Sequence, residues 1–252
     1  MYTWQKIIKF MYGNRAIRPK PPKGREPWAN TVLYVPMTED LLDHSWNNRT
    51  VTNNWVTISN KLWVFNWSSY LDLGNDSWTY NVNLNTISVW FKWNGGGSKD
   101  NCIIGKSEYY MRWHTYWQYQ ISIHEEDRHL TAWWMNGTDY NAHPLNFRTS
   151  SWGSPTLWPV AQANKWYHLV LTRDWNTKKA YIDWVLVATE DNTDNTNSNW
   201  NNKHLRIWSF ERYNYDSYFN WNISRVILEN KVRTAQEVLD YYNSTKSLYW
   251  IS

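Results

Sequence analysis

Short runs of alternating apolar and polar residues recur from about residue 30 onward, separated by Asn, Asp, Ser and Thr. Such runs are rich in Val, Ile, Tyr and Trp, which favour strands. They are TVLYVPM (31–37), SSYLDLG (68–74), TISVWFKW (86–93), NCIIGKS (101–107), YWQYQISIH (116–124), HLTAWWMN (129–136), KWYHLVLTRD (165–174), KKAYIDW (178–184), HLRIWSF (204–210) and NISRVILE (222–229). Many short strands at this spacing predict an all-β, antiparallel two-sheet sandwich.

The chain divides into an arm and a body. Residues 1–28 predict a basic N-terminal hairpin followed by a proline-rich linker. Residues 29–247 are the predicted sandwich domain, and residues 248–252 a tail. One short C-terminal helix is expected in RTAQEVLDYYN, where Thr234 and Glu237 form a capping box.

The net charge of +4 is concentrated in the arm. Seven Lys and Arg residues against Glu26 give residues 1–28 a net charge of +6, which leaves −2 for the rest of the chain. A basic arm on a near-neutral body is typical of a solvated or partner-docking segment. We therefore expect no nucleic-acid partner, and an oligomer formed through the arm is one alternative.

Targeting and redox signals are few. Cys102 is the sole cysteine, so no intrachain disulfide and no cysteine-based metal site is expected. No apolar run approaches the roughly 18–20 residues of a membrane span. The first residues contain lysines but no uninterrupted apolar stretch, so no signal peptide is predicted.

Tryptophan stands where a turn favours glycine. The hairpin KKAYIDWVLVATED has Asp183-Trp184 at its turn, although the turn needs positive φ and favours Asp-Gly or Asn-Gly. The chain has 22 tryptophans and 9 glycines, where ordinary usage predicts about 18 glycines. A residue with a Cβ in the left-handed region costs ~1–2 kcal/mol. Several such turns would therefore remove much of a domain's ~5–15 kcal/mol of stability.

Five motifs, in family order, resemble the concanavalin A-like, laminin-G-like jelly-roll family of bacterial and phage proteins. They are DHSWNNRTVTNN, FNWSSYLDLG, TISVWFK, KWYHLVLTRDWNTKKAYIDWVLV and YFNWNISRVILENKVRTAQEVLDYY. The resemblance covers roughly residues 30–245 and implies a jelly-roll sandwich. Trp90, Trp166 and His168 match family positions. Tryptophan replaces the family's glycine at Trp46, Trp67, Trp175, Trp184 and Trp221.

Two interpretations of these tryptophans remain open. One hypothesis is that the gene uses UGA for glycine, as some uncultured bacterial lineages do, and that Trp63 and Trp208 are then glycines too. The other takes the indoles at face value, as exposed stacking platforms for sugars. A core role fits Trp90 and Trp166.

Catalytic and metal-binding signals are weak. Glucanases of this fold share a Glu-x-Asp-x-Glu strand, but EEDRH places His129 at the last glutamate, and retaining hydrolysis needs carboxyl groups about 5–5.5 Å apart. His124 and His129 are spaced by five, where a zinc-protease helix needs four. Members of the family that the chain resembles often bind calcium, which would make Asp174, Asp191 and Asp194 candidate ligands. A solvated loop is the interpretation that the sequence favours for these residues.

The resemblance implies a non-catalytic module that binds a glycan or a partner protein, through apical loops or the concave sheet. It favours a phage particle or a cell surface as the location, in a structural or adhesion protein. The alternatives are a glycoside hydrolase of the same fold without a recognisable catalytic motif, and a purely structural virion component.

Overall fold

The structure is a computed structural model of the 252-residue chain. It describes residues 29–36, 40–59, 62–65, 69–76, 80, 84–95, 101–109, 115–123, 130–134, 161–174, 177–191, 204–207, 211–212 and 221–249. The predicted basic hairpin of residues 1–28 lies outside the described residues.

The elements follow the predicted alternation of short strands and turns. In chain order they are β1 (Thr31–Val35), β2 (Thr52–Asn54), β3 (Thr57–Ser59), β4 (Leu62–Phe65), β5 (Tyr70–Asp72), β6 (Thr86–Trp93), β7 (Asn101–Tyr109), β8 (Thr115–Ile123), β9 (Leu130–Trp134), β10 (Trp166–Arg173), β11 (Thr177–Ile182), β12 (Val185–Asp191), β13 (Arg206–Ile207), β14 (Glu211–Arg212), β15 (Trp221–Glu229), α2 (Ala235–Thr245) and η2 (Lys246–Tyr249).

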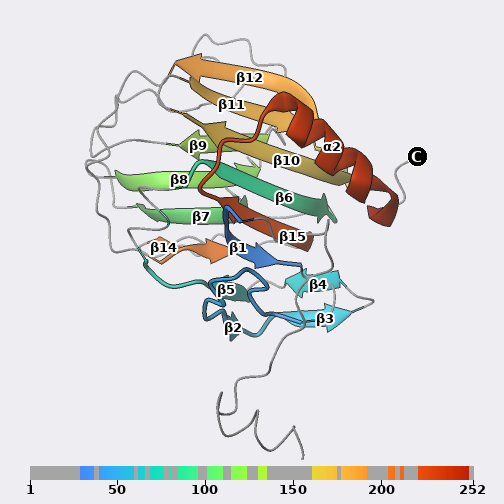
Figure 1. The fold of residues 1–252 in the computed structure, drawn as a ribbon. Helices are drawn as coiled ribbons and strands as arrows, with labels where there is room; N and C mark the ends of the chain where they lie inside the picture. Colours follow the sequence, from blue (N-terminus) through green and yellow to red (C-terminus); the bar gives the residue numbers. More distant parts are fainter. Residues whose placement is uncertain are drawn as a thin grey trace, which may run out of the picture.

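Two sheets form the predicted sandwich (Figure 1). The eight-stranded sheet has the order β12-β11-β10-β6-β15-β4-β3, with β1 paired to β15. The seven-stranded sheet has the order β2-β5-β13-β7-β8-β9, with β14 paired to β7. Strands far apart in sequence are neighbours, since β6 lies between β10 and β15. The prediction of an antiparallel two-sheet jelly roll is confirmed.

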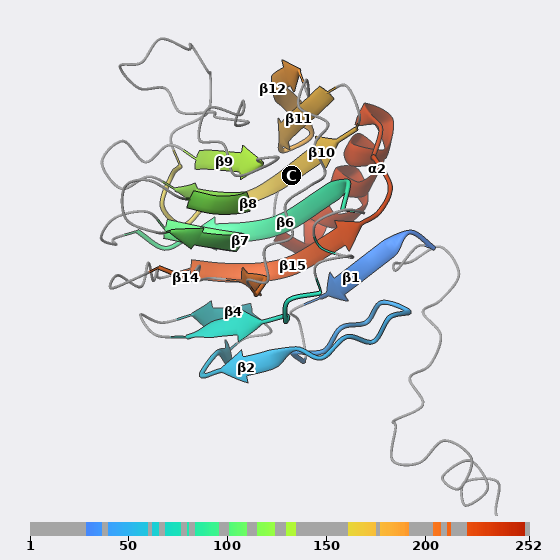
Figure 2. The same ribbon diagram turned by 90° about the vertical axis from the view of Figure 1, so that its left-hand side faces the viewer.

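The core lies between the two sheets, because alternate residues of each strand point inward. Val89 and Leu171 of one sheet and Ile104, Ile121 and Ile207 of the other are fully buried in one cluster. Helix α2 lies on the opposite face of the eight-stranded sheet, so the layers run sheet, sheet, helix (Figure 2).

The C-terminal helix begins where the sequence predicts. Thr234 is the N-cap, its hydroxyl accepts from the backbone N–H of Glu237, and the Glu237 side chain accepts from the backbone of Thr234. This confirms the capping box. Tyr242 is buried on the sheet side of the helix, and η2 continues the chain to Tyr249, which is also buried.

The β11–β12 hairpin closes at Asp183 and Trp184, as predicted. Ile182 pairs with Val185, and the two turn residues have φ values of 48° and 70°. Positive φ at both positions is the type I′ geometry, which matches the twist of the flanking strands. The Asp183 carboxylate accepts the backbone N–H of His168 at 2.9 Å, which joins the turn to β10.

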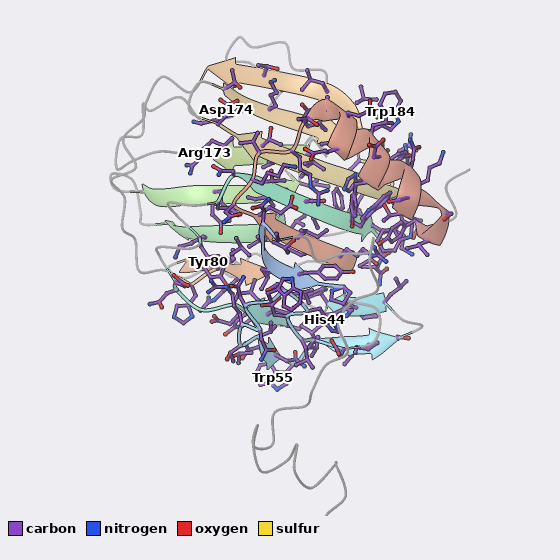
Figure 3. The ribbon with its side chains drawn as sticks, viewed as in Figure 1. His44, Trp55, Tyr80, Arg173, Asp174 and Trp184 are labelled. Carbon is purple, nitrogen blue, oxygen red and sulfur yellow. The ribbon has the colours of Figure 1, made fainter. Side chains whose placement is uncertain are left out.

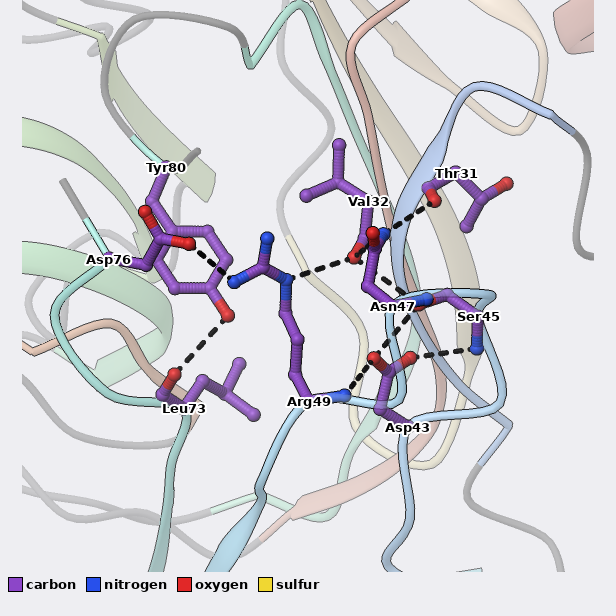
Figure 4. A network of polar contacts seen from close by, with 9 residues as sticks. All are labelled: Thr31, Val32, Asp43, Ser45, Asn47, Arg49, Leu73, Asp76 and Tyr80. Carbon is purple, nitrogen blue, oxygen red and sulfur yellow. Dashed lines mark hydrogen bonds and ion pairs between the residues drawn. The ribbon is translucent and has the colours of Figure 1, made fainter. Parts of the chain in front are cut away.

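The predicted Asp-x-Ser motif joins the loop after β1 to that strand (Figure 4). Asp43 accepts the backbone N–H of Tyr34 at 3.0 Å, of Ser45 at 2.8 Å and of Arg49 at 2.7 Å. Arg49 Nη1 then lies 2.6 Å from Asp76 Oδ2. The motif is therefore structural, because the buried Asp43 carboxylate is engaged by the backbone it organises.

Candidate functional site

A polar cluster lies on the outward face of the seven-stranded sheet, where β5 and β13 are neighbours. Arg206 pairs with Asp72, and Ile207 with Leu71. Leu71 and Ile207 are fully buried. Because side chains alternate along a strand, Tyr70 and Asp72 of β5 point to the same outward face as Arg206 of β13. His204 precedes β13 on that side.

The cluster is centred on the Asp72 carboxylate. His204 Nδ1 lies 2.7 Å from Asp72 Oδ1 and 2.8 Å from Oδ2, and Arg206 Nε lies 3.6 Å from Oδ2. Asp72 Oδ1 also accepts the backbone N–H of Gly74 at 2.8 Å. The Arg206 guanidinium carbon stands 4.8 Å from the centre of the Tyr70 ring, a cation–π contact. These contacts hold the carboxylate in one orientation.

The cluster opens to solvent at its imidazole. The His204 side chain is 44% exposed and the Asp72 side chain 16%. Carboxylate, imidazole and guanidinium together offer both acceptors and donors, which is what a ligand rich in hydroxyl groups requires. Glycoside hydrolysis uses a pair of carboxyl groups; among the described side chains of β2, β5, β7 and β13, Asp72 is the one carboxylate.

None of these four residues was singled out from the sequence as a site residue. The alternation in SSYLDLG and HLRIWSF does place Tyr70 with Asp72, and His204 with Arg206, on one face of each strand. The missing information is the pairing of β5 with β13, which joins residues 132 positions apart.

The family motif residues Trp90, Trp166 and His168 lie under the C-terminal helix. The Trp90 ring stacks on His168 at 4.8 Å and on Tyr249 at 4.1 Å between centroids, and Trp166 lies 4.8 Å from Tyr249. Trp90 and His168 are fully buried. They therefore form a docking surface for α2 and η2.

His168 sits in an environment that disfavours its charged form. Its Nε2 lies 2.9 Å from Ser88 Oγ, and no hydrogen-bond partner meets its Nδ1. Burial lowers the pKa of His168 well below its ordinary value, and the nearby Arg233 lowers it further. The imidazole is thus neutral at pH 7 and acts as a packed aromatic ring.

The tryptophans expected at glycine positions differ in their backbone. Trp184 has a φ of 70° and is 46% exposed. Trp46 is 62% exposed, but the positive φ of its loop, 44°, falls at Asn48. Trp221 is in β15, where φ is not positive. Trp67 and Trp175 lie outside the described residues.

Trp55 is a position that the sequence motifs did not single out. It has a φ of 59° and is 75% exposed. Trp55 and Trp184 lie at opposite ends of the molecule (Figure 3). Trp63 differs from both, since it is fully buried in the core, with its ring centroid 6.1 Å from that of Phe65. Trp208 lies outside the described residues.

The calcium candidates are only partly described. The Asp174 carboxylate accepts the backbone N–H of Thr177 at 2.6 Å and so closes the turn before β11 (Figure 3). Asp191 ends β12, and Asp194 lies outside the described residues, as do His124 and residues 125–129. Among the described side chains, no group of three His, Cys, Asp or Glu could hold a metal ion. No helix in the described part of the chain is long and apolar enough to cross a bilayer.

Solved structures share this fold. A Trypanosoma rangeli sialidase in complex with sialic acid is 13% identical, with a TM-score of 0.63 over 87% of this chain and 34% of the sialidase. The receptor-binding domain of the botulinum neurotoxin C/D mosaic serotype is 14% identical, with a TM-score of 0.62 over 85% of this chain and 51% of that one. Botulinum neurotoxin type C, whose cell entry depends on two ganglioside molecules, is 15% identical, with a TM-score of 0.61 over 85% of this chain and 51% of the toxin chain.

The chain therefore spans about a third of the sialidase and about half of the toxin chains. No curated protein sequence matches it significantly. The profile of the concanavalin A-like lectin/glucanases superfamily matches residues 65–239, which run from the end of β4 into α2. That match, over most of the sandwich described above, shows that the chain belongs to the concanavalin A-like lectin/glucanases superfamily.

Proposed function

We propose that the protein is a non-catalytic glycan-binding module, and that its site is the outward face of β5 and β13 around Asp72. The observation that carries the proposal is the Asp72 carboxylate held between His204 and Arg206, with Arg206 lying on Tyr70. Structures of the same fold support a sugar ligand, since one holds sialic acid and another belongs to a toxin that depends on gangliosides.

The geometry of the cluster suits a sugar. Neighbouring sugar hydroxyls are both donors and acceptors, so they match a carboxylate that accepts and a guanidinium that donates. Because the site stands on paired strands and Asp72 is already oriented, little side-chain ordering is needed when a ligand binds. His204, the most exposed of the four, is the group that a ligand meets first.

Asp72→Asn is expected to weaken glycan binding about 10- to 100-fold, because a hydrogen bond to a charged group contributes about 1.5–3 kcal/mol. A glycan array with neutral and sialylated sugars identifies the ligand. Isothermal titration calorimetry with the strongest hit then measures the affinity of each variant.

Asp240→Asn is the matched control, since it removes the same charge from an exposed carboxylate on α2, which accepts a hydrogen bond from Gln236 at 2.8 Å. Its affinity should equal that of the unaltered protein. Thermal unfolding of both variants checks that the sandwich is intact. An array without a bound glycan, or equal affinities for Asp72→Asn and the control, would contradict the proposed site.

We also infer that the natural protein carries glycine at positions 55 and 184, through UGA read as glycine. Two observations support this. Trp55 and Trp184 have φ values of 59° and 70°, where a Cβ costs about 1–2 kcal/mol. Trp55 is also 75% exposed, so burial of its indole does little to offset that cost.

Trp55→Gly is accordingly expected to raise the free energy of unfolding by about 1–2 kcal/mol. Urea denaturation measures it. Trp46→Gly is the matched control, because Trp46 is also largely exposed, at 62%, but lacks a positive φ; it should give no gain. Peptide mass spectrometry of the natively expressed protein identifies the residues directly. Tryptophan masses at positions 55 and 184 would exclude recoding there.

A further inference from the structure

We propose that one end of the sandwich binds the surface of a lipid bilayer that carries anionic headgroups. This end comprises the β11–β12 turn, the start of β10 and η2. Exposed apolar side chains project from the turn, and three lysines lie around it. The surface belongs to the eight-stranded sheet and its helix, whereas the Asp72 cluster belongs to the other sheet, so the proposal does not rest on glycan binding.

The apolar part of this surface is a rigid tip. Trp184, Val185 and Leu186 follow one another at the turn and are 46%, 48% and 49% exposed. The hydrogen bonds between Asp183 and His168 fix the turn to β10. Three consecutive exposed apolar residues on an ordered hairpin indicate an interaction site rather than the usual scatter of single residues.

The helical segment η2 adds one more exposed apolar side chain, that of Leu248, to the same end. Leu248 is 55% exposed, and its neighbour Tyr249 packs against Trp166 at the start of β10. The turn also lies close to α2, since Asp183 accepts the backbone N–H of His168 and the His168 ring stacks on Tyr242 of α2 at 6.1 Å between centroids. Figure 3 shows Trp184 at the outer end of its hairpin, next to α2.

Three lysines border the tip, and each lies over an aromatic ring. The ammonium nitrogen stands 5.7 Å from the ring centre for Lys92 over Trp166, 4.9 Å for Lys165 over Tyr167 and 5.9 Å for Lys246 over Tyr242. Such lysines cover apolar surface with their stems and present the charge at its edge. Asp183, the carboxylate at the turn, faces inward to the backbone N–H of His168.

An apolar tip with a rim of lysines and aromatic rings matches the two layers of a membrane interface. Apolar side chains enter the acyl boundary, rings lie at the headgroup level, and lysines meet anionic phosphates. A surface of this kind is complementary in charge to phosphatidylserine. Val185, Leu186 and Leu248 keep the tip apolar when residue 184 is glycine, so the proposal holds for either identity.

Vesicle flotation tests the proposal with the full chain. At low salt we expect the protein to float with vesicles of phosphatidylcholine containing about a third phosphatidylserine, and much less with phosphatidylcholine alone. Val185→Ser with Leu186→Ser should reduce the partition coefficient about tenfold or more. The triple variant Lys92→Gln, Lys165→Gln and Lys246→Gln should reduce it about 100-fold.

Ile58→Ser is the matched control, because Ile58 is 42% exposed on β3, the far edge strand of the same sheet. It should leave flotation unchanged. Asp72→Asn should also float normally, since these vesicles contain no glycolipid, and this separates the membrane surface from the glycan site. No flotation at low salt, or equal flotation of the Val185/Leu186 variant and the control, would overturn the proposal.

Discussion

Arg233→Ala is expected to lower the free energy of unfolding by about 3–5 kcal/mol, because it leaves a buried carboxylate without its partner. Arg233 Nε lies 2.5 Å from Glu229 Oε2, and the two side chains are 4% and 3% exposed. The guanidinium also lies 4.7 Å over the Tyr241 ring. The pair therefore joins the end of β15 to α2, and urea denaturation at pH 7 measures its loss.

The pH dependence of this variant follows from the Glu229 carboxyl group. Burial raises the pKa of Glu229, and the charge of Arg233 opposes that rise. Without Arg233 the folded state takes up a proton at Glu229 more readily, so the folded variant gains stability as the pH falls. The deficit of Arg233→Ala should therefore be smaller at pH 5 than at pH 7.

Lys231→Ala is the control for this experiment. Lys231 lies in the same segment between β15 and α2 and forms an ion pair with Glu237 of α2, but those side chains are 44% and 38% exposed. Exposed pairs contribute about 0–1 kcal/mol, so the control should lose little. Replacing both Arg233 and Glu229 by Met should recover much of the loss, since no charge then remains buried. A loss below 1 kcal/mol for Arg233→Ala would contradict the explanation.

The longer strands are predictable from the sequence because their residues repeat a clear pattern. TISVWFKW is expected over 86–93, and β6 spans Thr86–Trp93. By contrast, β2, β3 and β4 have three or four residues each and were not predicted. Segments of three or four residues are too short for a period of two to be recognised. Their pairing completes the sheets instead, since β2 pairs with β5, β3 with β4 and β4 with β15.

The candidate site depended on information that a single sequence does not hold. Alternation indicates which side chains share a face of one strand, but not which strands are neighbours in a sheet. The backbone of the turns was also only partly predictable. The family resemblance indicated glycine at position 46, but the positive φ of that loop is found at Asn48, and Asn tolerates the left-handed region better than most residues.

Acidification is expected to destabilise the fold through His168. This imidazole is fully buried, stacks on Trp90 and has Ser88 Oγ at 2.9 Å from Nε2. Burial lowers its pKa well below the usual 6.5, and the charge of Arg233 adds to this effect. A proton on His168 would therefore be a buried cation next to Arg233, beneath α2.

The sign follows from the lowered pKa of the folded state. Below pH 6.5 the unfolded chain binds a proton at His168 that the folded chain does not. The free energy of unfolding is therefore unaffected by His168 above pH 6.5, and it falls by up to about 1.4 kcal/mol for each pH unit below that value. Burial raises the pKa of Asp183 and of Glu229, so these carboxyl groups act in the opposite direction at lower pH.

His168→Gln separates these contributions, because the Asp183 and Glu229 carboxyl groups are present in both proteins. Urea denaturation between pH 7 and 5 gives two stability curves, and their difference in slope is the part that belongs to His168. The unaltered protein should lose stability more steeply than the variant. Hydrogen exchange should show the loss first in α2, which rests on His168 through Tyr241 and Tyr242. Parallel curves would mean that another group governs the acid response, since the variant lacks the only imidazole in this stack.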